Sequence, residues 1–248
     1  MKNILITGAS SGIGRSLALH YASKGIHLIL LARRKNLLNE LTIEIKAKGA
    51  TVELYEVDLS NFQKVQDIAA MLTVPDLIIL NAGISLGHNS EFSSFKEFKV
   101  LMDVNFLSNH ALIEPLIPKL VKGSKIVFIS SLASYFTMPS SIAYSSSKRA
   151  INAYAQGLRF YLKPKGINVV NILPGFIDTQ MTQKNNFSMP FFMDIESGTQ
   201  RIVKAIESGK ACNPFPKRFY IFIRLLSFLP HFLRDSIVSS LNKKKGIM

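Results

Sequence analysis

The sequence predicts an α/β fold, in which one doubly wound parallel sheet is flanked by helices and followed by a basic, apolar C-terminal extension. Short apolar runs alternate with stretches that carry apolar residues at helical spacing, and a glycine-rich turn joins the first run to the first such stretch. No repeat, low-complexity block or linker interrupts this pattern before about residue 210. Strands that alternate with helices imply right-handed crossovers and therefore a parallel sheet.

The apolar pattern assigns the elements in order. Short, mostly β-branched or alternating runs predict strands at residues 3–7, 27–31, 51–57, 76–80, 125–129 and 167–173. Apolar residues at helical spacing predict helices at residues 13–24, 36–48, 61–72, 95–121 and 142–162. Gly49 ends the second of these helices, and two prolines, Pro115 and Pro118, fall near the end of the fourth.

Composition excludes several classes of protein. With 248 residues, of which 48% are hydrophobic and 19% charged, the chain is too apolar to be disordered and long enough for a substantial core. The single cysteine, Cys212, excludes an intramolecular disulfide framework and a cysteine-cluster metal site. The five histidines lack ligand spacing, so we expect no catalytic metal.

The net charge of +14 favours anionic partners without choosing among phosphates, nucleic acid and acidic lipid. Only the charge suggests nucleic acid, because aromatic and basic residues do not interleave before the C-terminal segment, and we expect no nucleic-acid binding. We see neither a signal peptide nor an apolar run of the roughly 18 residues that a membrane span needs. The expectation is a cytoplasmic protein.

A glycine-rich turn follows the first predicted strand and opens the first predicted helix. Gly8, Gly12 and Gly14 let the backbone approach a pyrophosphate, which would sit on the helix N-terminus beside Ser10 and Ile13. The spacing is G-x-x-x-G-x-G, and only the strand–turn–helix context makes it specific. The alternative is a glycine-rich surface turn without a ligand.

Arginines stand where a dinucleotide site that selects NAD usually has an acidic residue, about 20 positions after the turn. Arg33 and Arg34 close the second predicted strand, and Arg15 follows the last glycine of the turn. Guanidinium groups bind phosphate well, so these residues favour NADP(H) over NAD(H). The alternative is that the arginines are merely solvated.

A possible acid–base group follows the fifth predicted strand. Ser130 and Ser131 close that strand, and Tyr144 and Lys148 lie on one face of the next helix, at positions i and i+4. A nearby ammonium group favours the phenolate, whereas the protonated phenol can give its proton to a carbonyl oxygen. A neighbouring serine hydroxyl would polarise that carbonyl.

Together these motifs resemble the short-chain dehydrogenase/reductase family, over about residues 1–206, and the resemblance implies a Rossmann fold. The family's tetrad would make Tyr144 the acid/base and Ser131 the holder of the substrate oxygen. Lys148 would lower the pKa of Tyr144 and hold the nicotinamide ribose, and Asn105 would anchor a proton-carrying water. Ser131 is preferred to Ser130 because it lies thirteen residues before Tyr144, the usual family separation.

The resemblance also implies cofactor contacts beyond the glycine turn and the arginines. Asp58 and Leu59 would meet the adenine, and Asn81 and Ala82 the adenosine end, while Asp58 could instead cap a helix and Asn81 could link strands. The full set of additional contacts comprises Asp58, Leu59, Asn81, Ala82, Gly83, Tyr144, Lys148, Pro174, Gly175, Ile177 and Thr179. Ile177 and Thr179 would meet the nicotinamide amide.

The C-terminal segment departs from the family pattern, because it lacks the strand and glycine pair that end many tetrameric members. We divide the chain into residues 1–210, the NADP(H)-binding and catalytic domain, and residues 211–248, an extension. From residue 216 onward seven Lys/Arg stand against one acid, so the last 33 residues carry +6. The extension either forms the last strand and packs over the pocket or a subunit partner, or contacts an anionic membrane, such as the inner membrane surface, peripherally.

The resemblance implies a lid at residues 180–193, with an apolar inner face formed by Met181, Phe187, Met189, Phe191 and Phe192. It also implies a homodimer or homotetramer assembled through the helices at 95–121 and 142–162. The predicted function is an NADP(H)-dependent oxidoreductase that moves hydride between nicotinamide and a lipophilic ketone or 3-oxoacyl-type carbonyl, or the corresponding alcohol. The alternative is a non-catalytic protein that senses NADP(H).

Overall fold

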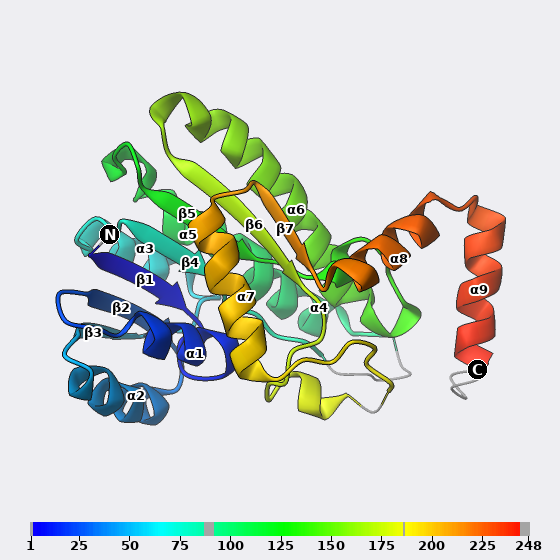
Figure 1. Cartoon of the computed structure of the whole chain (residues 1–248), viewed down its shortest axis with the longest axis horizontal. Helices are drawn as coiled ribbons and strands as arrows, with labels where there is room; N and C mark the ends of the chain where they lie inside the picture. Colours follow the sequence, from blue (N-terminus) through cyan, green and yellow to red (C-terminus); the bar gives the residue numbers. More distant parts are fainter. Residues whose placement is uncertain (1, 87–91, 186, 244–248) are drawn as a thin grey trace.

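The computed structural model describes residues 2–86, 92–185 and 187–243, and its centre is one sheet of parallel strands (Figure 1). The strand order is β3-β2-β1-β4-β5-β6-β7, so the doubly wound parallel sheet predicted from the sequence is confirmed. The strands are β1 (Asn3–Thr7), β2 (His27–Ala32), β3 (Thr51–Glu56), β4 (Leu77–Leu80), β5 (Lys125–Ile129), β6 (Asn168–Pro174) and β7 (Cys212–Phe215). The order reverses between β1 and β4, and ligands of such sheets bind outside the carboxyl ends of the strands at this reversal.

Helices cover both faces of the sheet because successive side chains of a strand point to opposite faces. Ile4 and Ile6 of β1 pack with α1 (Gly12–Tyr21), α2 (Lys35–Ala47) and α7 (Ile195–Ser208). Leu5, between them, belongs to the opposite core. That core also includes residues of α3 (Phe62–Met71), α5 (Ser108–Ile113) and α6 (Ile142–Leu162).

The predicted helix at residues 95–121 is wrong as a single regular helix. The chain forms α4 (Phe95–Met102), a π-helical turn at Asp103–Leu107, α5, and a separate 3₁₀ turn at Ile117–Lys119. Pro115 lacks the backbone N–H that would continue α5, and the π turn holds one extra residue within the helix. The first helix likewise ends at Tyr21, earlier than expected, before a turn in which Gly25 has a φ of +86°.

The segment after residue 210 contributes to the sheet and then leaves it. β7 pairs in parallel with β6 and forms the edge of the sheet. It is followed by α8 (Lys217–Phe228) and α9 (His231–Lys243), and α9 stands away from the sheet layers (Figure 1). Ile223 anchors α8 by packing against Leu132 and Leu173. Within the described ranges, every helix is too short or too polar to cross a membrane.

Candidate active site

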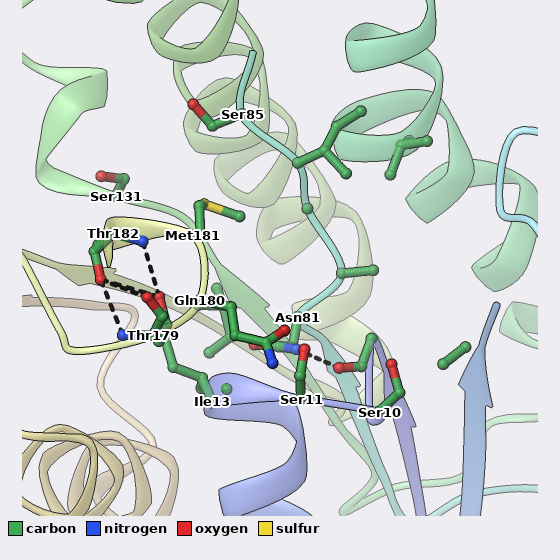
Figure 2. Close-up of a pocket in the computed structure, with 18 of the residues that line it drawn as sticks. Ser10, Ser11, Ile13, Asn81, Ser85, Ser131, Thr179, Gln180, Met181 and Thr182 are labelled. Carbon is green, nitrogen blue, oxygen red and sulfur yellow. Dashed lines mark hydrogen bonds between the residues drawn. The ribbon is translucent and has the colours of Figure 1, made fainter. Parts of the chain in front are cut away.

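A cleft of about 370 Å³ lies at the carboxyl ends of the strands, where the sheet order reverses (Figure 2). The predicted site residues that line this cleft are Gly8, Ser10, Gly12, Ile13, Arg33, Arg34, Asp58, Leu59, Asn81, Ala82, Gly83, Ser131, Tyr144, Lys148, Pro174, Gly175, Ile177 and Thr179. Three others, Gly14, Arg15 and Asn105, do not line it. The structure therefore brings together segments that lie far apart in the sequence.

The glycine turn needs its glycines for two different reasons. Gly8 and Gly12 have φ angles of +67° and +53°, in the left-handed region that favours glycine. At Gly14 a Cβ atom would lie 2.4 Å from the carbonyl oxygen of Gly8, so a side chain there would collide with the turn. Gly14 thus allows the close packing of the turn without lining the cleft, whereas the other two glycines line it.

Hydrogen bonds tie the turn to the end of β4. The Thr7 hydroxyl accepts bonds from the backbone N–H groups of Asn81 and Ala82, both at 3.0 Å. The Asn81 side-chain amide in turn donates to the Thr7 carbonyl oxygen at 3.0 Å. Asn81 therefore links neighbouring strands, the alternative that its residue type suggested, and also lines the cleft.

Arg34 lies over the glycine turn. Its guanidinium group donates to the hydroxyl of Ser10 from Nε at 3.2 Å and also contacts the hydroxyl of Ser11. Its Nη1 donates to Oε1 of Gln180 at 3.0 Å. Gln180 reaches from the segment after β6 toward Ser11 (Figure 2). Arg34 thus joins the glycine turn to the segment after β6.

The other two predicted arginines are placed differently. Arg33 lies 3.6 Å from the Asp58 carboxylate, measured from Nη1 to Oδ2. Burial raises the pKa of Asp58, but hydrogen bonds from Ser60 and the Arg33 guanidinium outweigh burial, so its pKa is lowered overall. Arg15 pairs with Glu44 at 2.5 Å and does not line the cleft.

Lys148 is buried and Tyr144 is half-buried at the other end of the cleft. The Lys148 ammonium group donates to the Ile129 carbonyl oxygen at 2.9 Å and lies 5.7 Å from the centre of the Tyr144 ring. Burial lowers the pKa of Lys148 to about 8. Burial also raises the pKa of Tyr144, which a hydrogen bond with Ser131 only partly opposes. In the chain alone the expected lowering of the Tyr144 pKa by Lys148 is therefore not seen, because desolvation dominates.

Asn105 lies in the π turn, fully buried behind the cleft. Its Oδ1 accepts from the backbone N–H of Ile84 at 2.7 Å. Its Nδ2 donates to the Ile84 carbonyl oxygen and to the Ser147 hydroxyl, both at 3.0 Å. Gly83 leaves room between Asn105 and Lys148, since a Cβ there would lie 3.4 Å from Asn105 Oδ1 and 3.5 Å from Lys148 Nζ.

Sequence reasoning missed two residues that hold the site together. Ser147 donates to the Tyr144 carbonyl oxygen at 2.8 Å while accepting from Asn105, so it joins the π turn to α6. The run of serines between Tyr144 and Lys148 could have indicated a hydrogen-bonding role for Ser147. Gln180, the partner of Arg34, gave no signal because their contact joins distant segments.

The segment expected to form a lid contributes little apolar surface to the cleft. Of its five proposed apolar residues, Met181 lines the cleft. Phe191 and Phe192 are about half exposed, and the Phe191 ring centre lies 5.7 Å from that of Phe219 in α8. Residue 186 lies outside the described residues. The apolar part of this segment thus packs toward α8 as well as toward the cleft.

Comparisons with known proteins agree with this geometry. The family model for short chain dehydrogenases matches residues 2–189. An uncharacterized oxidoreductase of Myxococcus xanthus is 32% identical over 241 residues, which cover 95% of each chain.

Two solved structures share the fold. A short-chain dehydrogenase from Sphingobium yanoikuyae in complex with NADPH has a TM-score of 0.80 at 24% identity, covering 93% of this chain and 97% of that one. A short chain dehydrogenase from Mycobacterium paratuberculosis bound to NAD has a TM-score of 0.74 at 22% identity, covering 86% and 95%.

The fold and the cleft define a nucleotide-binding α/β protein with a tyrosine close to a buried lysine. The chain belongs to the short-chain dehydrogenase family, as the resemblance of its motifs predicted, and it is an oxidoreductase of that type.

Proposed function

We propose that the protein is an NADP(H)-dependent oxidoreductase that interconverts a lipophilic ketone, or a 3-oxoacyl-type carbonyl, and its alcohol. The observation that carries the proposal is the arrangement along one cleft. Arg34 lies over the glycine turn at one end, and Ser131, Tyr144 and the buried Lys148 meet at the other.

The residues of the cleft fit a pyridine dinucleotide. Gly8 and Gly12 have positive φ angles, and without side chains they leave a cradle at the N-terminus of α1 that a Cβ atom would fill. Arg34 presents several donors beside that cradle, which suits a 2′-phosphate better than a bare ribose hydroxyl. When bound, a nicotinamide would supply or accept the hydride.

The chain's own residues handle the proton and the carbonyl. Because burial raises the pKa of Tyr144, its phenol stays protonated at neutral pH and can donate to a carbonyl oxygen. Ser131 holds that oxygen through a hydrogen bond, and the Lys148 ammonium group stabilises the tyrosinate left after transfer. Asn105, Ser147 and Ile84 fix the backbone around these groups.

A lipophilic substrate is supported by apolar residues in the cleft lining, among them Ile84, Val104, Ile177 and Met181. Such walls exclude water from the reacting carbonyl and favour apolar substituents. A non-catalytic NADP(H) sensor would need no complete serine, tyrosine and lysine set, and no contact among the described residues favours that alternative.

Assembly and membrane contact form part of the same proposal. Exposed apolar residues on the helices expected to join subunits, such as Leu107, Phe160 and Tyr161, support a homodimer or homotetramer. Exposed apolar residues on α8 and α9, flanked by cations, support peripheral contact with an anionic membrane.

The test follows nicotinamide absorbance with NADPH or NADH and carbonyls from short ketones to long-chain 3-oxoacyl esters. We expect turnover with NADPH and a fall of about 10²–10⁴-fold in kcat for Tyr144→Phe, because the phenolic proton is lost. Tyr161→Phe, an exposed tyrosine of the same helix, is the matched control. NADPH binding without turnover on any carbonyl would favour the sensor, and full activity of Tyr144→Phe would contradict the mechanism.

A further inference from the structure

A second cavity, of about 610 Å³, lies between α6, β7, α8 and α9 and shares no lining residue with the cleft. Four arginines line it: Arg149 and Arg159 from α6, Arg224 from α8, and Arg234 from α9. Its described lining includes no carboxylate. Among the described residues, no carboxylate lies within 4.0 Å of any of these four guanidinium groups.

All four arginines also make other contacts. Arg159 lies over the Phe160 ring, 4.5 Å from its centre, and Arg234 Nη2 lies 2.6 Å from His231 Nδ1. Arg149 donates from Nε to the Ser134 carbonyl oxygen at 2.9 Å. Arg224 lies over the Tyr135 ring, 4.9 Å from its centre. Four like charges around one cavity repel each other, and an anion that enters it relieves this repulsion. The planar fork of arginine matches phosphate oxygens in particular.

Asn171 provides a second, independent sign of a ligand. Its side chain is 7% exposed, lines the same cavity, and donates from Nδ2 to Asn152 Oδ1 at 2.8 Å. Its own Oδ1 is buried and accepts no hydrogen bond from any described residue. A buried acceptor without a donor is costly, so an O–H or N–H group that reached this atom from the cavity would be stabilised.

We propose that this cavity is a second anion site, which binds a phosphate group that has a hydroxyl or amide donor beside it. The arginines bind the phosphate oxygens, and Asn171 accepts the hydrogen bond from the adjacent donor. The site is connected to Lys148 in α6 by hydrogen bonds. Asn152 Oδ1 also accepts from the Ser130 hydroxyl, and the same hydroxyl contacts the Lys148 carbonyl oxygen. The phosphate comes either from a soluble ester or from a lipid headgroup.

Cys212 makes the site measurable, since it is the only cysteine of the chain, is exposed and lines the cavity. The experiment measures the rate of Cys212 labelling by the neutral reagent N-ethylmaleimide at constant ionic strength. Desolvation raises the pKa of Cys212, and a hydrogen bond with Tyr135 and the Arg224 guanidinium partly oppose it, so a bound anion both covers the thiol and disfavours its thiolate. Glycerol 3-phosphate should slow labelling with half-saturation at about 1 mM or lower.

Arg159→Gln/Arg234→Gln removes two cavity charges and should raise the half-saturating concentration at least tenfold. The matched control, Arg201→Gln/Lys204→Gln, removes two charges from exposed positions of α7 and should behave as the wild type. Equal protection in both double variants, or no protection by any phosphate probe, would overturn the proposal.

A second arm of the experiment identifies the source of the phosphate. Vesicles of phosphatidylglycerol are compared with vesicles of phosphatidylcholine alone. Protection of Cys212 by phosphatidylglycerol vesicles but not by glycerol 3-phosphate, lost in Arg159→Gln/Arg234→Gln, assigns the site to a lipid headgroup. Protection by glycerol 3-phosphate alone assigns it to a soluble ester.

Discussion

At the scale of single residues, Lys148 shows how the proposed chemistry opposes stability. The side chain is buried and its ammonium group has one hydrogen bond, to the Ile129 carbonyl oxygen. The fall of its pKa from 10.5 to about 8 corresponds to a cost of about 3 kcal/mol for keeping the charge in the core at neutral pH. A core selected for stability alone would place an apolar residue here.

Replacing this lysine therefore should stabilise the fold. Lys148→Met removes the buried charge but also the bond to Ile129, worth about 1 kcal/mol, so we expect a gain of about 2 kcal/mol in the free energy of unfolding at pH 7. Carbonyl reduction should be lost in the same variant. Urea denaturation measures the first effect and the absorbance assay the second.

The pH dependence distinguishes this cause from better packing. The pKa of Lys148 is lower in the folded chain than in the unfolded chain, so between pH 8 and 10.5 the unfolded wild type binds more protons. The free energy of unfolding of the wild type therefore increases as pH rises through this window, because the buried lysine loses its charge. The advantage of Lys148→Met should shrink by pH 10, and an advantage independent of pH would contradict the argument.

Arg34 carries the proposed preference for NADP(H). Its contacts with Ser10, Ser11 and Gln180 place its donors beside the glycine turn. Hydrogen bonds to charged groups contribute about 1.5–3 kcal/mol, so Arg34→Ala should weaken NADPH binding by about 10–100-fold and NADH binding little. Arg15→Ala is the control, because that arginine pairs with Glu44 outside the cleft. Equal losses for both nucleotides in Arg34→Ala, measured by fluorescence titration, would remove the basis for the preference.

At the scale of elements, the sequence located the buried strands and the long helix because local patterns determine them. Strands β1 and β5 and helix α6 have the predicted boundaries, since each combines an uninterrupted apolar run or face with turn residues at its ends. The π turn at Asp103–Leu107 could not be predicted, because it depends on how that helix packs against α6. Strand β7 contains Pro214, and only pairing with β6 at the sheet edge makes it a strand.

The candidate site also combines features that local sequence patterns predict with contacts that they do not predict. The glycine turn and the Tyr144–Lys148 pair each follow from spacing within their own segment, and the resemblance to the family implied that both belong to one site. Both line the cleft. The contacts of Gln180 and Ser147 join segments that are distant in the chain, and the pairing of Arg15 with Glu44 depends on how α1 meets α2. Such contacts are set by tertiary packing, which local patterns do not encode.

Helix α8 supports the segment that follows β6. The Phe219 ring lies 6.0 Å from that of Phe176 and 5.7 Å from that of Phe191, measured between ring centres. Phe219→Ala removes these contacts and should loosen residues 176–185 and 187–193, part of which lines the cleft. We expect a higher KM for the carbonyl with little change in kcat, and faster backbone hydrogen exchange in this segment. Phe222→Ala, 56% exposed on the same helix, should change neither.

At the scale of the whole molecule, charge and apolar surface are concentrated at the same end. The chain carries +14, and the last 33 residues contribute +6 of it. Leu225, Phe228 and Phe232 are 64%, 73% and 71% exposed on the two C-terminal helices. Each Lys or Arg near an anionic bilayer contributes about 1 kcal/mol of attraction, and each buried large apolar side chain about 1.5–3 kcal/mol.

These magnitudes predict that the full chain sediments with anionic vesicles at low salt and less at high salt, where exposed charges are screened. Leu225→Ser/Phe228→Ser/Phe232→Ser should abolish sedimentation, because it removes several kcal/mol of apolar transfer while leaving every charge in place. Charge attraction alone would leave this triple variant bound.

The matched control separates membrane contact by the C-terminal helices from nonspecific adsorption of exposed apolar residues to vesicles. Ile43, Met71 and Phe95 are 72%, 73% and 81% exposed, as much as the three residues above, but lie on α2, α3 and α4. Ile43→Ser/Met71→Ser/Phe95→Ser therefore removes comparable apolar surface away from α8 and α9, and should sediment like the wild type. If both triple variants lose vesicle binding equally, the contact is not specific to the C-terminal helices. If the wild type stays in the supernatant at low salt, their apolar face has another role, and assembly with a second copy becomes the alternative to test.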